Sequence, residues 1–176
     1  MMNKKLNGIL RKKVASATAA LLLASSLSVI TASASGNIIP LMTSNTNSLG
    51  TAYASSEWAG HEAYQAFDHN DSTYWSTSSG SYGELRFSFS SQKKVTSYTL
   101  RTSSQAAGNT PKNWTFQASN DGVNWTVLDT AAYTLSPNFT YTFSILNNSY
   151  YSKYRLVITA NGGAYSTSVA EVQMFE

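Results

Sequence analysis

The chain has 176 residues, no cysteine, 12 basic and nine acidic residues, and a formal net charge of +3. Without cysteine it forms no disulfides, so a folded domain must be held by its core, with help from a metal where one binds. Charged residues are sparse and aromatic residues make up 12% of the chain, a β-rich composition that excludes an intrinsically disordered protein.

Residues 1–34 have the three parts of a secretory signal peptide. Lys4, Lys5, Arg11, Lys12 and Lys13 form the basic start, an apolar stretch centres on residues 21–23, and Ala32-Ser33-Ala34 has the small residues of a cleavage site. We expect cleavage after Ala34 and a secreted protein. The alternative is a membrane anchor, but the apolar core is shorter than the roughly 20 residues of a spanning helix.

Removing this segment reverses the charge. Five of the 12 basic residues and no acidic residue lie in 1–34, which leaves seven basic against nine acidic residues and a net charge of −2. A nucleic-acid-binding protein needs a basic patch on its folded domain, and the remaining basic residues are scattered. We therefore expect no nucleic-acid partner. The remaining 142 residues suit one domain.

After a short N-terminal lead over residues 35–43, residues 44–176 are expected to form an all-β domain. Apolar and polar residues alternate with the period of half-buried strands, and no helix of convincing length is predicted. The apolar series are Leu85-Phe87-Phe89, Trp114-Phe116-Ala118, Tyr141-Phe143-Ile145 and Tyr154-Leu156-Ile158. Asn120-Asp121-Gly122 predicts a hairpin between two strands. Seven or eight short strands at this spacing indicate a β-sandwich.

Four motifs follow one another along this domain. They occupy residues 66–75, 111–129, 154–156 and 170–175, and read AFDHNDSTYW, PKNWTFQASNDGVNWTVLD, YRL and AEVQMF. In this order they resemble the discoidin domain, also called the coagulation factor V/VIII type C domain, and are similar to family 32 carbohydrate-binding modules. The resemblance implies an eight-stranded jelly-roll β-sandwich of the galactose-binding-domain-like type. It also implies a binding site in the loops at one end and a structural cation nearby.

The cation site is also suggested by the residues themselves, because calcium takes six to eight oxygen ligands. Asp68 and Thr73 lie five apart in a turn-rich loop, and Glu171 on the last strand offers a second carboxylate. The resemblance assigns as ligands the carbonyls of Gln65, Asn70 and Ala170 and the side chains of Asp68, Thr73 and Glu171. His69 stands where the family usually has Gly, which strains the loop if a positive φ is required. The alternative is that Asp68 only caps a turn and Glu171 is solvated.

Sugar sites combine an aromatic face with a few polar groups. Candidates for such a site on loops near the cation are Glu57, Trp58, His61, Arg101, Asn109 and Tyr165. Two have alternatives: Trp58 as a ring packed over the core edge, and Arg101 as a surface ion pair. Trp75, Trp114 and Trp125 match core positions of the family. Galactose-binding relatives often carry His and Trp where this chain has Ser76 and Ser79, which argues against a module that binds galactose.

These features predict a secreted, calcium-stabilised, non-catalytic module that binds a glycan or polysaccharide. Catalysis is disfavoured because His61-Glu62 lacks the second His of a zinc-protease helix, and no nucleophile elbow is present. The alternative is an adhesion module that binds a cell-surface protein, or a membrane-surface binder. Because the loops are rich in Ser, Asn and Gly and not in exposed apolar residues, membrane insertion is the less favoured of these two alternatives.

Overall fold

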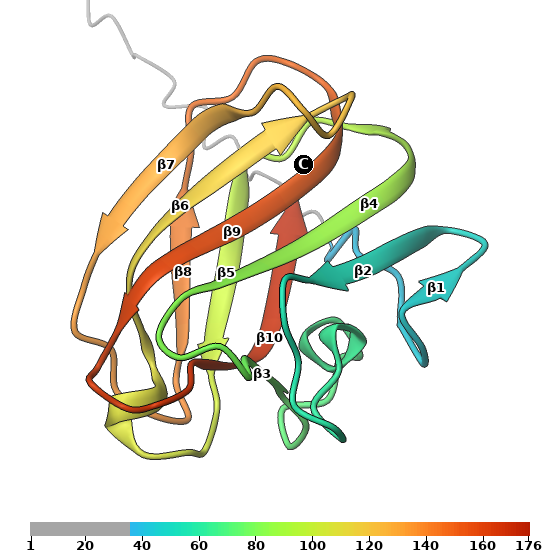
Figure 1. The fold of residues 1–176 in the computed structure, drawn as a ribbon. Helices are drawn as coiled ribbons and strands as arrows, with labels where there is room; N and C mark the ends of the chain where they lie inside the picture. Colours follow the sequence, from blue (N-terminus) through green and yellow to red (C-terminus); the bar gives the residue numbers. More distant parts are fainter. Residues whose placement is uncertain (1–35) are drawn as a thin grey trace, which may run out of the picture. The chain divides into compact units, whose positions relative to one another are not determined.

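Two antiparallel sheets form the domain in the computed structural model, which describes residues 36–176 (Figure 1). The predicted signal peptide and its cleavage site at Ala34 lie outside the described residues. No helix within residues 36–176 is long and apolar enough to cross a membrane.

The larger sheet has six strands, in the order β1 (Thr46–Asn47), β2 (Gly50–Ala54), β4 (Gly83–Lys93), β9 (Tyr151–Asn161), β6 (Pro111–Ser119) and β7 (Thr126–Ala132). The smaller sheet has four, in the order β3 (Trp75–Ser76), β10 (Ser168–Phe175), β5 (Ser97–Thr102) and β8 (Thr140–Ser144). Two short 3-10 helices, η1 (Ala63–Ala66) and η2 (Ala107–Asn109), complete the described elements. Eight of the ten described strands have at least five residues, and the expected all-β sandwich is confirmed.

The core lies between the two sheets and is built by the alternation seen in the sequence. Phe87 on β4, Phe116 on β6 and Tyr154 on β9 are fully buried and point toward the smaller sheet. Tyr98 on β5 stacks on Phe116, with ring centroids 4.2 Å apart. The Trp114 indole N–H donates to the Tyr98 hydroxyl over 2.9 Å. Stacked rings and a satisfied buried polar group therefore join the two layers.

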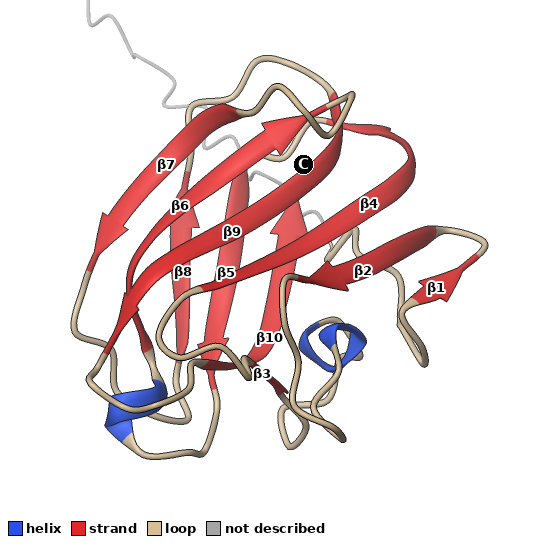
Figure 2. Cartoon of the chain, in the orientation of Figure 1, coloured by secondary structure: helices blue, strands red, loops and turns tan. Residues whose placement is uncertain are grey.

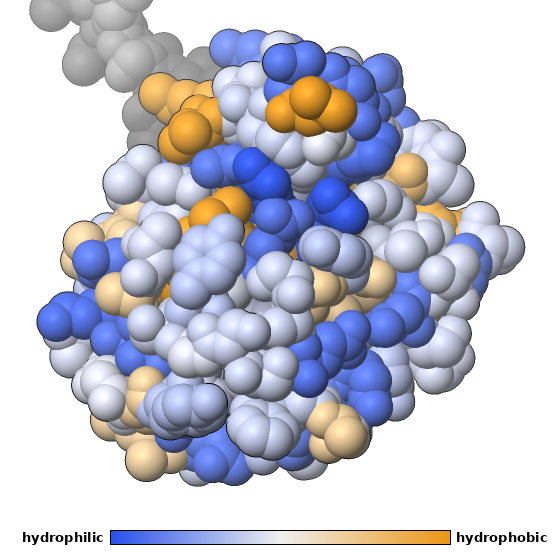
Figure 3. Space-filling view, in the orientation of Figure 1, coloured by the Kyte–Doolittle hydropathy of each residue, from blue (hydrophilic) through white to orange (hydrophobic). Residues whose placement is uncertain are grey.

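The tryptophans divide into two groups. Trp75 and Trp114 are buried, as predicted. The expectation that Trp125 occupies a core position is wrong, since it is only partly buried and the Arg155 guanidinium lies 3.8 Å from its ring centroid. That face of the larger sheet is turned toward the viewer in Figure 3 and is mostly hydrophilic. Trp125 therefore supports a cation–π contact on the outer face of the sandwich.

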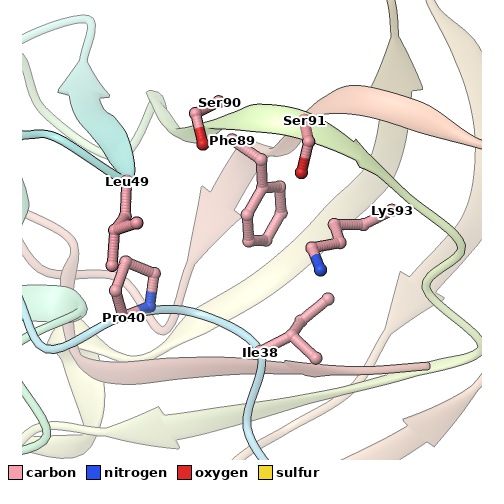
Figure 4. Close-up of a pocket in the computed structure, with 7 residues that line it drawn as sticks. All are labelled: Ile38, Pro40, Leu49, Phe89, Ser90, Ser91 and Lys93. Carbon is pink, nitrogen blue, oxygen red and sulfur yellow. The ribbon is translucent and has the colours of Figure 1, made fainter.

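Part of the N-terminal lead is packed into the domain. Ile39 and Met42 are 1% exposed and belong to the core. The N–H of Ile38 donates to the carbonyl of Met174 on β10, and the N–H of Met42 donates to the carbonyl of Phe67. A shallow hollow of about 230 Å³ lies beside this segment, and Figure 4 shows the side chains around it. It is lined by Ile38, Pro40, Leu49, Phe89, Ser90, Ser91 and Lys93.

Four connections gather at one end of the sandwich. They are residues 55–74 between β2 and β3, 103–110 between β5 and β6, 133–139 between β7 and β8, and 162–167 between β9 and β10. Figure 2 shows both short helices at this end, the lower one in the view. The predicted hairpin at Asn120-Asp121-Gly122 joins β6 to β7 at the opposite end. Loops far apart in the sequence can therefore form one surface.

Candidate functional site

The loop from Asp68 to Thr73 gathers oxygen atoms in a small volume. The Thr73 hydroxyl lies 2.7 Å from Asp68 Oδ2 and 2.8 Å from the carbonyl oxygen of Asn70. The N–H of Asn70 donates to Asp68 Oδ1 over 3.0 Å. The Thr73 hydroxyl therefore lies within hydrogen-bonding distance of two other predicted cation ligands, the Asp68 carboxylate and the Asn70 carbonyl.

His69 occupies the tight turn of this loop with a φ of +56°. His69 therefore adopts the left-handed conformation that we expected to strain the loop. Its ring helps to hold that conformation, because Nε2 lies 2.9 Å from Asn37 Nδ2 and 3.1 Å from the carbonyl oxygen of Ile39. The N-terminal segment thus supports the loop directly.

Glu171 approaches this loop from β10. The β10–β5 register shifts between Val169 and Glu171, so that Ala170 is an extra residue, and the Glu171 side chain is turned to the outer face of the smaller sheet. The residue is only 2% exposed, yet neither carboxylate oxygen accepts a well-formed hydrogen bond. Ala170 is fully buried, and η1, which contains Gln65, packs against β10.

Burial, together with the nearby carboxylates of Asp68 and Asp71, raises the pKa of Glu171 to about 8. The backbone amides of His69 and Asn70 lie near enough to lower this pKa in part. A buried, unpaired carboxylate facing two other acids is costly unless a cation joins it.

The donor set fits a hard divalent cation. Among residues 36–176 no three His, Asp or Glu side chains are placed to hold a metal by themselves. Asp68 and Glu171 would need additional oxygen atoms from the Thr73 hydroxyl and from main-chain carbonyls. Mixed carboxylate, hydroxyl and carbonyl ligands are those that calcium takes.

Arg101 lies beside this loop near the end of β5, on the outer face of the smaller sheet. Its Nε is 3.0 Å from Asp71 Oδ2, a charge contact without good hydrogen-bond alignment. Its two terminal nitrogens donate to Asn138 Oδ1 over 2.8 Å and to Thr140 Oγ1 over 3.1 Å. Arg101 also lines a hollow of about 150 Å³ with Glu171. Arg101 therefore links the Asp68–Thr73 loop, through Asp71, to Asn138 and Thr140.

Two other predicted ligand-binding residues make contacts within the chain. Glu57 Oε2 accepts a hydrogen bond of 2.9 Å from the N–H of Ala63, at the start of η1. Asn109 Nδ2 donates to the carbonyl and the hydroxyl of Ser166, over 2.9 and 3.0 Å. Glu57 therefore positions η1, and Asn109 ties the 103–110 loop to the 162–167 loop.

The remaining three candidates present rings at the loop end. Trp58 is 46% exposed and Tyr165 is 75% exposed. The N–H of Trp58 donates to the carbonyl of Ser76, and the N–H of His61 donates to the carbonyl of Trp58. The His61 ring stacks on Tyr74, with centroids 4.2 Å apart and ring planes 15° apart. Trp58 and His61 are thus fixed next to each other.

Tyr165 belongs to a loop that is tied to the same region. The N–H of Thr77, next to Ser76, donates to the carbonyl of Thr167, and the N–H of Ala164 donates to the carbonyl of Gly108. Gln105 Nε2 donates to the Tyr74 hydroxyl over 2.7 Å. Sequence reasoning missed Tyr74 and Gln105. Tyr74 stands beside the motif tryptophan, whereas Gln105 has no sequence signal.

The family model of the F5/8 type C domain matches residues 51–172, more than half of the chain. The chain belongs to the F5/8 type C domain family. The resemblance seen in the four sequence motifs is therefore confirmed. A comparison with curated proteins finds no match.

Solved structures share the fold of this F5/8 type C domain. A family 32 carbohydrate-binding module of a Clostridium perfringens family 89 glycoside hydrolase, in complex with GalNAc-β-1,3-galactose, has 19% identity and a TM-score of 0.65, and covers 72% of this chain and 95% of its own. The family 32 module of Clostridium perfringens NanJ, in complex with galactose, has 22% identity and a TM-score of 0.64, with coverage of 72% and 93%. Chitosan-binding module 1 of a chitosanase/glucanase from Paenibacillus sp. IK-5 has 27% identity and a TM-score of 0.60, with coverage of 72% and 94%.

Proposed function

We propose that this F5/8 type C domain is a non-catalytic carbohydrate-binding module that contacts its ligand through Trp58, His61 and Tyr165. The observation that carries the proposal is the pair of exposed rings, Trp58 and Tyr165, on linked loops at one end of the sandwich. Exposed aromatic faces stack on the C–H faces of sugar rings, and nearby polar groups bond the hydroxyls. Gln105 and the stacked His61–Tyr74 pair supply such groups.

The structural neighbours support the carbohydrate class, because they include modules solved with galactose and with GalNAc-β-1,3-galactose, and a chitosan-binding module. A site with two stacking rings and no deep pocket buries little ligand area. We therefore expect a dissociation constant on the order of 10 µM to 1 mM for each site.

Binding to immobilised polysaccharides and to a glycan array, with chitosan and galactose-terminated glycans included, tests this proposal. Trp58→Ala and Tyr165→Ala are expected to weaken binding by about tenfold each, since a stacked ring contributes roughly 1 kcal/mol or more. Tyr150→Ala is the matched control, because Tyr150 is 56% exposed just before β9, at the opposite end from Tyr165. The proposal fails if no glycan binds, or if Tyr150→Ala reduces binding as much as the two site variants.

We further propose that calcium joins Asp68, Thr73 and Glu171 with carbonyl oxygens of Gln65, Asn70 and Ala170. The unpaired buried carboxylate of Glu171 supports this ligand set. With extracellular calcium near 1 mM and micromolar affinity, the ion would stabilise the fold by roughly 4 kcal/mol. This matters for a secreted domain that contains no disulfide.

Thermal unfolding with and without a chelator tests the calcium proposal. Calcium is expected to raise the melting temperature of the wild type and to have little effect on Asp68→Ala. Glu176→Gln removes an exposed carboxylate that contacts Lys93 and accepts a hydrogen bond from the N–H of Lys94, and it should keep the full calcium response. A wild-type melting curve unchanged by exhaustive chelation would contradict this site.

A further inference from the structure

We propose that a hollow beside η2 binds a carboxylated sugar residue, a uronate, and so forms a second subsite of this module. The proposal rests on the proposed carbohydrate-binding function and names a ligand class for it. The hollow has a volume of about 160 Å³ and lies at the same end of the sandwich as Tyr165. Its lining residues are Ala107, Gly108, Thr110, Lys112, Tyr133, Thr134, Leu135 and Gly162.

The size of the hollow limits what can enter. Pockets for drug-sized ligands begin at about 300 Å³, so this one holds roughly half of such a ligand. One sugar ring of a longer chain fits that description, with the rest of the chain lying over the surface. The walls come from the three connections that follow β5, β7 and β9, and from Lys112 near the start of β6.

Tyr133 gives the hollow a ring held in a fixed orientation. It is 52% exposed, so part of the ring faces solvent. Its other contacts are with buried or partly buried rings: the centroid of Trp114 lies 6.0 Å away and that of Phe143 lies 5.8 Å away. A ring supported in this way loses little conformational freedom when a ligand stacks on it.

Lys112 places a positive charge next to that ring. The N–H of Tyr133 donates to the carbonyl of Lys112 over 2.9 Å, which makes the two residues neighbours across β6 and β7. The Lys112 side chain is exposed and forms no ion pair with any residue in 36–176. An ammonium without a protein partner, beside an aromatic face, is complementary to a sugar that carries a carboxylate.

Two glycines let the 103–110 and 162–167 loops approach each other closely beside the hollow. A Cβ at Gly162 would collide with the carbonyl oxygen of Ala107, and one at Gly108 would come within 3.1 Å of the Ala164 side chain. The N–H of Gly162 donates to the carbonyl of Thr110 over 3.0 Å. The loop that supplies Gly162 also carries Tyr165, so one polysaccharide chain following this loop would meet the hollow and the exposed ring in turn.

The test compares acidic oligosaccharides with their neutral counterparts. The probes are a galacturonate trimer and a glucuronate-containing hyaluronate tetramer, each paired with its carboxyl-reduced form and measured at fixed free calcium. Wild-type protein is expected to bind at least one acidic form about fivefold more tightly than its reduced form, and this preference should shrink as salt is added. Lys112→Arg should retain the preference, and Lys112→Glu should abolish it.

Lys94→Glu is the matched control. Lys94 also lies beside an exposed tyrosine, 6.0 Å from the ring centroid of Tyr150, but after β4, at the opposite end from η2. Lys94→Glu makes the same change of charge as Lys112→Glu and should leave the preference for the acidic oligosaccharide intact. Lys112 is exposed, so circular dichroism and melting curves should confirm that the Lys112 variants fold.

The proposal is overturned by the absence of a preference for either acidic probe, by a preference that survives Lys112→Glu, or by an equal loss with Lys94→Glu. Each is distinguishable from failure of the proposed function, which is judged on neutral glycans with Trp58→Ala and Tyr165→Ala. Tighter binding to a sulfated oligosaccharide than to both uronates would also overturn the assignment of the ligand as a carboxylate.

Discussion

Arg101 and Glu171 stand directly opposite each other on β5 and β10, yet their side chains form no ion pair. The Arg101 guanidinium contacts Asp71, 3.0 Å away, and the carboxylate of Glu171 stays buried without an ion-pair partner. Opposite charges on paired strands usually attract each other. Here Arg101 contacts Asp71 of the loop instead, so the carboxyl group of Glu171 remains available for the proposed cation.

The pH dependence of stability should report on Glu171. In protein stripped of divalent cations, burial raises its folded-state pKa to about 8, against an ordinary value of 4.5. The folded state therefore holds a proton that the unfolded state releases, so the free energy of unfolding should fall as pH rises from 5 to 8, by up to about 4 kcal/mol. Urea unfolding in chelator should show this decline.

Glu171→Gln and calcium should each remove that decline. The amide cannot ionise, and a bound cation stabilises the carboxylate in its charged form. Matching pH profiles for wild type and Glu171→Gln in chelator would show that Glu171 does not carry the effect.

Arg101→Gln should separate support of the loop from sugar recognition. The change removes the contact with Asp71, which is largely exposed, so calcium affinity should fall by only about fivefold. Sugar affinity at saturating calcium should stay the same, because Arg101 lies on the sheet face and its donors reach Asn138 and Thr140. Calorimetry of calcium and of glycan binding measures both. A loss of sugar affinity at saturating calcium would instead favour the direct ligand role that the sequence suggested.

Ile39→Ala should destabilise the domain by about 2–4 kcal/mol, because Ile39 is 1% exposed and its removal leaves a cavity in the core. Leu41→Ala is the control two residues away, where the side chain is 57% exposed and little change is expected. Urea unfolding measures both. Similar small effects of the two variants would mean that residues before Thr46 add nothing to the stability of the fold.

Asp121→Ala should lower the melting temperature by loosening the β6–β7 turn. The N–H groups of Val123 and Asn124 both donate to Asp121 Oδ1 over 2.8 Å, and these bonds hold the pKa of Asp121 well below its ordinary value. The stability that this carboxylate supplies is present above its ordinary pKa and is lost as pH falls toward the lowered one. The wild-type and variant melting temperatures should therefore converge only in strong acid. Val123→Ala, in the same turn, should change neither the melting temperature nor its pH dependence. A difference in melting temperature between wild type and Asp121→Ala that persists in strong acid would contradict this account.

Much of the fold was predictable from local patterns. The alternation of Leu85, Phe87 and Phe89 sets which face of β4 is buried, and Asn120-Asp121-Gly122 sets the hairpin, because both depend on neighbouring residues. The oxygen-rich loop at Asp68–Thr73 was visible for the same reason. Family motifs added the expectation that the end of the chain returns to this loop.

Local sequence patterns and motifs were enough to predict the strand pattern, the candidate cation loop and the family of this domain. Three-dimensional packing was needed to show that Glu171 is buried without an ion-pair partner, that Arg101 contacts the loop, and that Lys112 and Tyr133 border one hollow. These relations depend on which strands pair and in what register, including the extra residue at Ala170. Strand pairing and burial are set by packing between distant segments, and local sequence does not encode which distant groups will share a water-excluded space.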